Sequence, residues 1–181
     1  MMHNHTFTPS LFARLQSHAA PFVDTIDDVI GRALDALDAT KGNLTVADSG
    51  APHVCNPAAM PSLTYTTPKK LSLNGVPIIK EVYWNTLMNE TIRAAGKQGL
   101  SPDLILGLMK VPAKPGEFDG PGYKFIEEAG ISVQGQNANR AWQQTYAIAD
   151  ALDFTVEAEW VWQNNDKAHL PKKAGSAKMP A

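Results

Sequence analysis

The sequence predicts an α+β protein made of two unequal parts. Residues 1–40 carry two helical patterns behind a short extended stub, whereas residues 64–165 mix helical periodicity with the alternation typical of strands. Residues 41–63 are rich in Gly, Pro, Ser and Ala and have no apolar periodicity, which predicts a flexible linker. Residues 166–181 are basic and are expected to form a flexible tail.

Length and composition fit one ordinary domain plus a small accessory module. The single cysteine, Cys55, cannot form an internal disulfide, which agrees with a reducing compartment. No run is long and apolar enough to cross a bilayer, and the first twenty residues lack an apolar signal core. These features predict a bacterial cytoplasmic protein without membrane contact.

The formal net charge of −2 hides separate charged blocks. Residues 1–65 hold three Lys and Arg against six Asp and Glu, and residues 66–114 hold seven against three. Residues 115–166 hold two against nine, and residues 167–181 hold four basic residues and no acidic one. Such blocks suit an anionic partner that touches one face, although an ordinary mixed surface would also produce them.

The N-terminal part predicts two amphipathic helices. Thr8 and Pro9 suit the start of the first helix, and Thr25 with Asp28 forms a capping-box pattern at the second. Ahead of them, residues 5–8 resemble a very short strand that would pair with the same strand of a second copy. This is the ribbon-helix-helix layout, and a module of 40 residues needs such a partner to bury enough apolar surface. The residues expected to support oligomerisation are Phe7, Leu11, Leu15, Ile26, Val29, Ile30 and Leu34.

Two stretches, "FTPSLFARLQSHA" and "VDTIDDVIGRAL", resemble the N-terminal module of the SeqA family of negative modulators of replication initiation. The resemblance implies that this module dimerises and promotes higher assembly without reading DNA. The acidity of this module agrees with a role other than reading DNA, because a ribbon that reads DNA is normally basic. A helical hairpin docked on its own C-terminal domain is the alternative. His3 and His5 alternate like metal ligands but have no Asp, Glu or Cys nearby, so neither a metal nor a cofactor is expected.

The C-terminal part begins with "KKLSLNGVPII", a predicted hairpin in which Asn74-Gly75 fits a tight turn and Pro77 confines the second arm to an edge. A helix is predicted in "EVYWNTLMNETIRAAGKQG", and Ser101 with Pro102 predicts the start of another. "PAKPGEFDGPG" is predicted to be a loop.

A strand–helix–strand series follows. "YKFIEEAGISVQ" predicts a strand, "RAWQQTYAIADAL" a helix and "FTVEAEWVW" a second strand. The second strand is expected to bury one face, formed by Phe154, Val156, Ala158, Trp160 and Trp162.

The candidate binding residues cluster in the turn between the first of these strands and the helix. Amide side chains can pair with adenine in the major groove, Arg can pair with guanine, and backbone amides at a helix start suit a phosphate. A purely structural interpretation is also open, in which Asn137 or Asn139 caps the helix and Gln134 only decorates a strand. The candidate DNA-binding residues are Gln134, Gln136, Asn137, Asn139 and Arg140, together with Lys69, Lys70, Lys172 and Lys173 from the basic blocks.

The stretch "PGYKFIEEAGISVQGQNANRAWQQTYAIADAL" resembles the DNA-reading end of the SeqA C-terminal domain. In that family the matching turn contacts the bases of hemimethylated GATC sites, and the match falls on Gln136, Asn137, Asn139 and Arg140. The resemblance implies a homodimeric, nucleoid-associated regulator that reads a short duplex site, with sensitivity to base modification as a further expectation. This chain lacks the Thr residues of that turn, has Ala141 where a second basic residue is expected, and adds a final strand and basic tail.

Two other function classes compete with DNA reading. Asp150, Asp153, Glu157 and Glu159 could suggest a metal-dependent nuclease, but the expected lysine is missing and a solvated strand edge explains them. Neither a Ser-His-Asp arrangement nor a glycine-rich phosphate loop is apparent, so no catalytic residue is assigned. The other class is an assembly subunit of a multi-protein defence or restriction complex, in which the C-terminal domain binds protein instead of DNA.

Overall fold

The chain divides into two units, Met1–Ser49 and Gly50–Ala181. The computed structural model describes residue 30 and residues 51–180. Ile30 lies in a helix and is half-buried. Residues 41–50 of the predicted linker lie outside the described residues. So do the other residues predicted to support oligomerisation, which are Phe7, Leu11, Leu15, Ile26, Val29 and Leu34.

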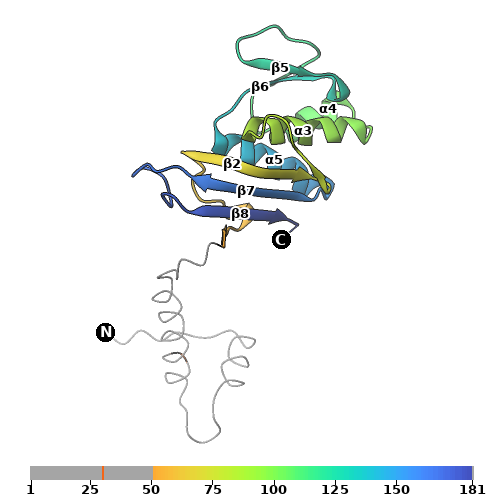
Figure 1. The fold of residues 1–181 in the computed structure, drawn as a ribbon. Coiled ribbons are helices and arrows are strands. Elements are labelled where there is room, and N and C mark those ends of the chain that lie inside the picture. The colour runs from red at the N-terminus through yellow and green to blue at the C-terminus, as the bar shows by residue number, and fades with distance from the viewer. Residues whose placement is uncertain (1–29, 31–50, 181) are drawn as a thin grey trace, which may run out of the picture. The chain divides into compact units, whose positions relative to one another are not determined.

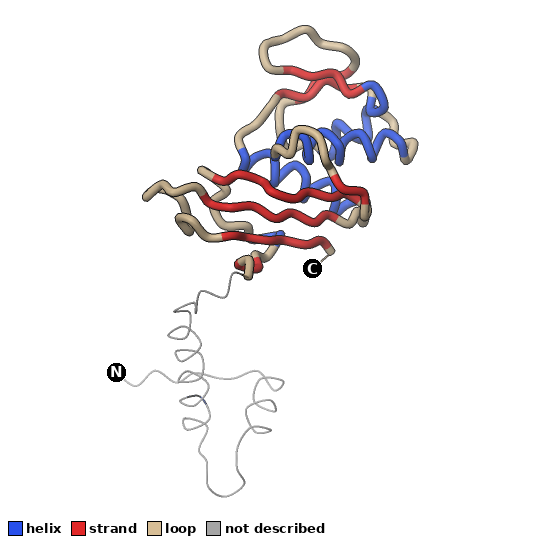
Figure 2. Tube along the Cα trace, viewed as in Figure 1, coloured by secondary structure: helices blue, strands red, loops and turns tan. Residues whose placement is uncertain are grey.

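A five-stranded sheet forms one layer of the second unit (Figures 1 and 2). Its strand order is β1-β8-β7-β2-β3. The two-residue strand β1 runs parallel to β8, and the other neighbours are antiparallel. The strands are β1 (His53–Val54), β2 (Thr66–Leu73), β3 (Val76–Pro77), β7 (Val156–Trp162) and β8 (Ala174–Met179).

Helices α3 (Trp84–Lys97) and α5 (Ala138–Leu152) pack against one face of this sheet. Trp84 of α3 makes edge-on ring contacts with Trp142 of α5 and with Trp160 of β7, with ring centroids 5.9 and 5.7 Å apart. Beyond α3 lie α4 and a second sheet of three strands, in the order β4-β6-β5 (Figure 1). The remaining elements are η1 (Pro57–Ala59), α4 (Pro102–Leu108), β4 (Ala113–Pro115), β5 (Tyr123–Ile126), η2 (Glu127–Ala129) and β6 (Ile131–Gln134).

The periodic patterns of the sequence are confirmed in this unit. Strand β7 alternates strictly between buried and half-buried side chains, with the predicted tryptophans inside. On its outer face, Glu157 pairs with Lys178 and Glu159 with Lys70, at 2.8 and 3.1 Å. These ion pairs account for the carboxylates of β7 as parts of a solvated sheet face.

The local turn and capping signals are also confirmed. Asn74 and Gly75 both have positive φ, as a tight hairpin turn requires. Ser101 caps α4, and its hydroxyl accepts a hydrogen bond from the Leu104 amide. In both places a short-range side-chain preference decides the backbone conformation.

The predicted linker does not extend to residue 63. Cys55, Pro57 and Leu63 are buried, and β1 pairs with β8. Two indole N–H groups hold this segment: Trp142 donates to the Pro57 carbonyl at 3.0 Å, and Trp162 donates to the Ser62 carbonyl at 2.9 Å. The segment therefore belongs to the domain because its apolar side chains are buried and distant tryptophans donate hydrogen bonds to its carbonyl groups.

The predicted basic tail is likewise not a tail. Residues 174–179 form β8, which pairs along its length with β7 and buries Gly175, Ala177 and Met179. Gly175 lies directly against the ring of Trp160, where a Cβ would collide with the indole. A glycine is therefore required at this position. The prediction failed because the small residues of this strand give it the composition of a flexible segment.

Two other assignments also differ in detail. Residues 113–115 of the predicted loop form β4. The stretch predicted as one strand is a hairpin of β5 and β6, because Gly130 adopts a left-handed conformation with φ of 62° and reverses the chain after η2. Within residue 30 and residues 51–180, none of the helices is long and apolar enough to cross a membrane.

Candidate functional site

The candidate turn links β6 to α5 and is clamped by α3. The Asn85 side chain donates from Nδ2 to the Gln136 carbonyl at 2.7 Å and accepts from the Gln136 amide at 2.8 Å. The Gln136 side chain then donates to the Gln134 carbonyl at 2.9 Å. Paired hydrogen bonds of this kind fix both the position and the orientation of the backbone that they hold. The turn is thus held in one conformation before any ligand arrives.

Asn137 and Asn139 have different roles at the start of α5. Asn137 is exposed and caps the helix, because its Oδ1 accepts from the Arg140 amide at 3.1 Å. Asn139 is half-buried and points back into the domain, where its Oδ1 accepts from the Leu63 amide at 2.7 Å and its Nδ2 donates to the Thr64 hydroxyl at 3.0 Å. Asn137 keeps a free amide donor, whereas Asn139 uses both ends of its amide on the 63–64 segment.

Arg140 and Gln144 connect α5 to the chain that precedes β4. Arg140 is exposed, and its Nη2 donates to the Lys110 carbonyl at 3.3 Å. The buried Gln144 accepts from the Lys110 amide and donates to the Leu108 carbonyl at 3.3 Å. One further backbone bond, from the Gln134 amide to the Pro112 carbonyl at 3.0 Å, joins the turn to the same segment. Residues 108–114 and 134–140 therefore form one surface.

The two segments of this surface carry no carboxylates. The sequence has no Asp or Glu between Asp103 and Glu117, and none between Glu128 and Asp150. The segments contribute Lys110, Lys114 and Arg140, which are all exposed. In residues 51–180 none of these three forms an ion pair. We call the group of Lys110, Lys114, Gln134, Asn137 and Arg140 the turn surface.

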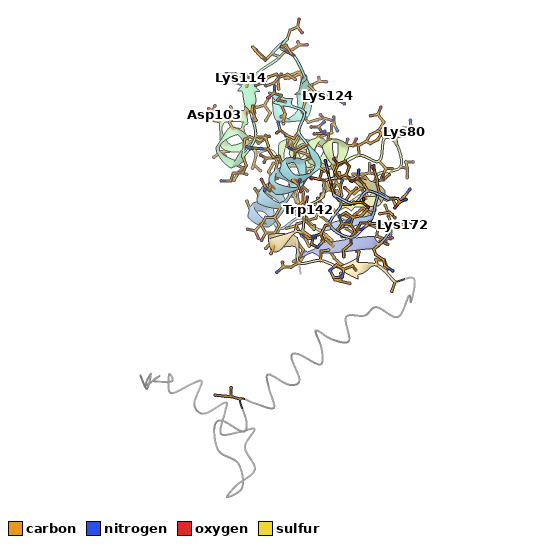
Figure 3. All side chains as sticks on the ribbon, turned by 90° about the vertical axis from the view of Figure 1, so that its left-hand side faces the viewer. Lys80, Asp103, Lys114, Lys124, Trp142 and Lys172 are labelled. Atoms are coloured by element: carbon orange, nitrogen blue, oxygen red, sulfur yellow. The ribbon has the colours of Figure 1, made fainter. Side chains whose placement is uncertain are left out.

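The remaining predicted lysines lie on or directly before strands of the five-stranded sheet. Lys69 and Lys70 sit at an irregularity of β2, and Lys70 is paired with Glu159. Lys172 and Lys173 precede β8, where the Lys172 amide donates to the Trp162 carbonyl at 3.0 Å. Figure 3 shows Lys172 beside the five-stranded sheet and Lys114 at the other sheet, well separated. The structure thus brings together the turn residues but not all of the predicted lysines.

Sequence reasoning missed Asn85, Lys110, Lys114 and Gln144. Asn85 and Gln144 lie 51 and 34 residues from their partners, so no local pattern indicates their roles. The absence of carboxylates in residues 104–116 and 129–149 was a usable signal, but charge counted over longer blocks obscured it.

The shifted pKa values lie away from the turn surface. Hydrogen bonding to its own backbone amide and the nearby Arg93 lower the pKa of Glu128, and a hydrogen bond from Lys178 lowers the pKa of Glu157. Burial raises the pKa of the Cys55 thiol, which disfavours the reactive thiolate. Among the described residues, no group of three or more His, Cys, Asp or Glu side chains could hold a metal ion.

Comparison of the chain with protein-family models, with curated proteins and with solved structures finds no match.

Proposed function

We propose that this protein binds duplex DNA through the turn surface and catalyses no reaction. The observation that carries the proposal is the meeting of two carboxylate-free segments that expose Lys110, Lys114 and Arg140 beside a clamped turn. Exposed cations on neighbouring segments without acidic residues attract a polyanion, and a fixed turn loses little conformational entropy on binding.

The groups on this surface divide by the part of DNA that they suit. Lys110 and Lys114 suit phosphates, and so do the backbone amides at the start of α5. The free amide donor of Asn137 and the guanidinium of Arg140 suit base edges in the major groove. Asn139 is a positioning residue in this scheme, because both ends of its amide are engaged within the domain. Sensitivity to base modification would arise at Asn137 or Arg140.

The proposal includes a homodimer formed through residues 1–40 and a nucleoid-associated location in the cytoplasm. Two tethered DNA-binding domains raise apparent affinity through their effective concentration. The apolar pattern around Ile30 supports self-association, and Ile30→Asp would place a charge on that apolar face. Light scattering should show a dimer or larger assembly for the natural chain and a smaller species for Ile30→Asp. A monomeric natural chain would contradict this part of the proposal.

The test of DNA binding uses the full chain and fluorescently labelled duplexes. Binding of a pool of random sequences is measured at about 50 and 200 mM salt, and the pool is then selected for tight binders in unmodified and methylated forms. We expect affinity to fall steeply with salt and a short motif to emerge from selection. Weak, salt-independent association would reject the DNA-binding proposal and favour the assembly subunit.

A further inference from the structure

A second exposed surface lies between α3 and the edge strand β3. It is a groove of about 410 Å³. Its strand side presents Val76, Ile78 and Ile79, and its helix side is a stripe that runs from Thr86 to Lys97. Val76 and Ile79 are 66% and 81% exposed, values that mark this as an uncovered apolar patch.

The backbone of β3 argues against an added strand as the occupant. The Ile78 amide donates to the Leu71 carbonyl at 2.8 Å, so residues 76 and 78 direct their backbone groups toward β2 and residue 77 faces outward. Residue 77 is proline, which has no N–H to offer a new strand. A partner protein would therefore contact the groove through its side chains and not by adding a strand to the sheet.

The length of the groove suits a helix. Thr86 and Lys97 are eleven residues apart along α3, a distance of roughly 16 Å or three turns. A partner helix of that length places apolar side chains at i, i+3 or i+4, and i+7 on one face, which is the spacing that a groove beside a helix accepts.

Cations flank the apolar centre at both ends. Lys80 precedes the start of α3 by four residues, and Lys97 is its last residue. Lys80 projects from the loop ahead of α3 in Figure 3 and has no ion-pair partner in residues 51–180. Lys97 forms an ion pair with Glu128 at 3.8 Å, and its side chain remains 63% exposed. Arg93, between them, is already paired with Glu90 and Glu128.

We propose that this groove binds an amphipathic helical segment of another protein, about three turns long, whose apolar face fills the groove and whose carboxylates contact Lys80 and Lys97. The groove does not share lining residues with the turn surface, so the two surfaces can be occupied and tested independently.

The probe is a synthetic helical peptide of about three to four turns, with Leu on one face and Glu elsewhere, titrated against the full-length chain. Two matched peptides replace every Glu by Lys, or every Leu by Ser. We expect saturable binding of the Leu/Glu peptide, at least about tenfold weaker binding of the Leu/Lys peptide, and none of the Leu/Ser peptide. Methyl resonances of Val76, Ile78 and Ile79 should shift on binding. Equal binding of the Leu/Lys peptide, or no binding of the Leu/Glu peptide, would overturn the proposal.

Two surface variants locate the site. Ile79→Asp should lower the affinity for the Leu/Glu peptide at least about tenfold. Val54 is 79% exposed at the opposite edge of the sheet, so Val54→Asp should leave this affinity unchanged. Unchanged binding by Ile79→Asp would overturn the proposal. A change in its oligomeric state would also overturn it, because the occupant would then be a second copy.

A charge reversal tests the cations at the rim of the groove. Lys80→Glu should lower the affinity for the Leu/Glu peptide and raise the affinity for the Leu/Lys peptide, because the sign of the flanking charge is reversed. If Lys80→Glu still prefers the Leu/Glu peptide over the Leu/Lys peptide as strongly as the natural chain does, Lys80 does not contact the peptide. DNA binding should be the same in all three variants.

Discussion

The turn surface and the groove share α3 as their support but differ in chemistry. Asn85 of α3 fixes the polar turn through two hydrogen bonds, and Thr86, the next residue, already lines the groove. The turn surface exposes cations on segments without carboxylates, whereas the groove exposes apolar side chains on its strand side and the Glu90–Arg93 ion pair on its helix side, with Lys80 and Lys97 also in its lining. Binding at the first should weaken steeply with salt, and binding at the second should depend mainly on apolar burial. One helix can thus position two surfaces that respond to different solution conditions.

Helix α3 supports both surfaces, and a change that distorts its packing should destabilise the domain more than any other substitution that we propose. Gly96 of α3 packs directly on the backbone of Glu128, where a Cβ would collide with the carbonyl group. We expect Gly96→Ala to lower the free energy of unfolding by about 1–3 kcal/mol or more, because backbone must shift to admit the methyl group. Urea unfolding followed by tryptophan fluorescence measures this loss.

Gly107→Ala is the matched control for that variant. Gly107 lies in α4 with open space where a Cβ would be placed, so alanine should stabilise the helix by up to about 1 kcal/mol. Similar stabilities for the two variants would show that the contact between α3 and η2 is loose enough to admit a methyl group.

Asn85→Ala separates the two surfaces. The substitution removes both hydrogen bonds to Gln136, so we expect a stability loss of about 1–2 kcal/mol and a weaker affinity for DNA. Binding of the Leu/Glu peptide in the groove should not change. Asn89→Ala, about one turn along the same helix, is the control and should retain DNA affinity. If Asn85→Ala binds DNA like the natural chain, the clamp has no part in recognition.

The two asparagines at the start of α5 sharpen the division between reading and support. Asn137→Ala removes the helix cap, which should cost about 1 kcal/mol of stability, and it should also flatten the preference for particular DNA sequences. Asn139→Ala should cost stability by releasing the 63–64 segment while leaving sequence preference intact. Selection of bound sites with each folded variant distinguishes the two roles. The reverse assignment would place base reading at Asn139.

The pH dependence of stability should change least, through Glu128, which pairs with Arg93 and Lys97 of the groove. The pKa of Glu128 is lowered from 4.5 in the folded protein, so its contribution to stability is present above that pH and is lost as the pH falls below it toward the lowered pKa. Glu128→Gln should slightly reduce the free energy of unfolding at pH 7. It should also make the loss of stability on acidification less steep. Urea midpoints between about pH 3 and 7 measure this. An acid loss as steep as that of the natural chain would exclude Glu128 as its source.

Local signals in the sequence correctly predicted the hairpin of β2 and β3, the helices α3, α4 and α5, and the strand β7. Alternation identified β7, helical spacing identified α5, and capping residues identified α4, because these features depend on neighbours within a few positions. The segments 51–63 and 174–179 were wrongly predicted as flexible because they are held by tryptophans and by pairing with a distant strand. The turn residues were found from their type, but the distinct roles of Asn137 and Asn139 depend on contacts with residues far along the chain.

We propose that the turn surface binds DNA through its exposed cations, Lys110, Lys114 and Arg140. The direct measurement is the salt dependence of duplex binding for the natural chain and for the triple variant Lys110→Gln, Lys114→Gln and Arg140→Gln. A second triple variant, Lys80→Gln, Lys97→Gln and Lys178→Gln, removes the same charge elsewhere on the domain. We expect the first variant to bind all sequences more weakly and to lower the slope of log affinity against log salt by about two, roughly one for each lost phosphate contact of Lys110 and Lys114, while the second keeps the natural slope. Equal slopes for the two variants would contradict the claim.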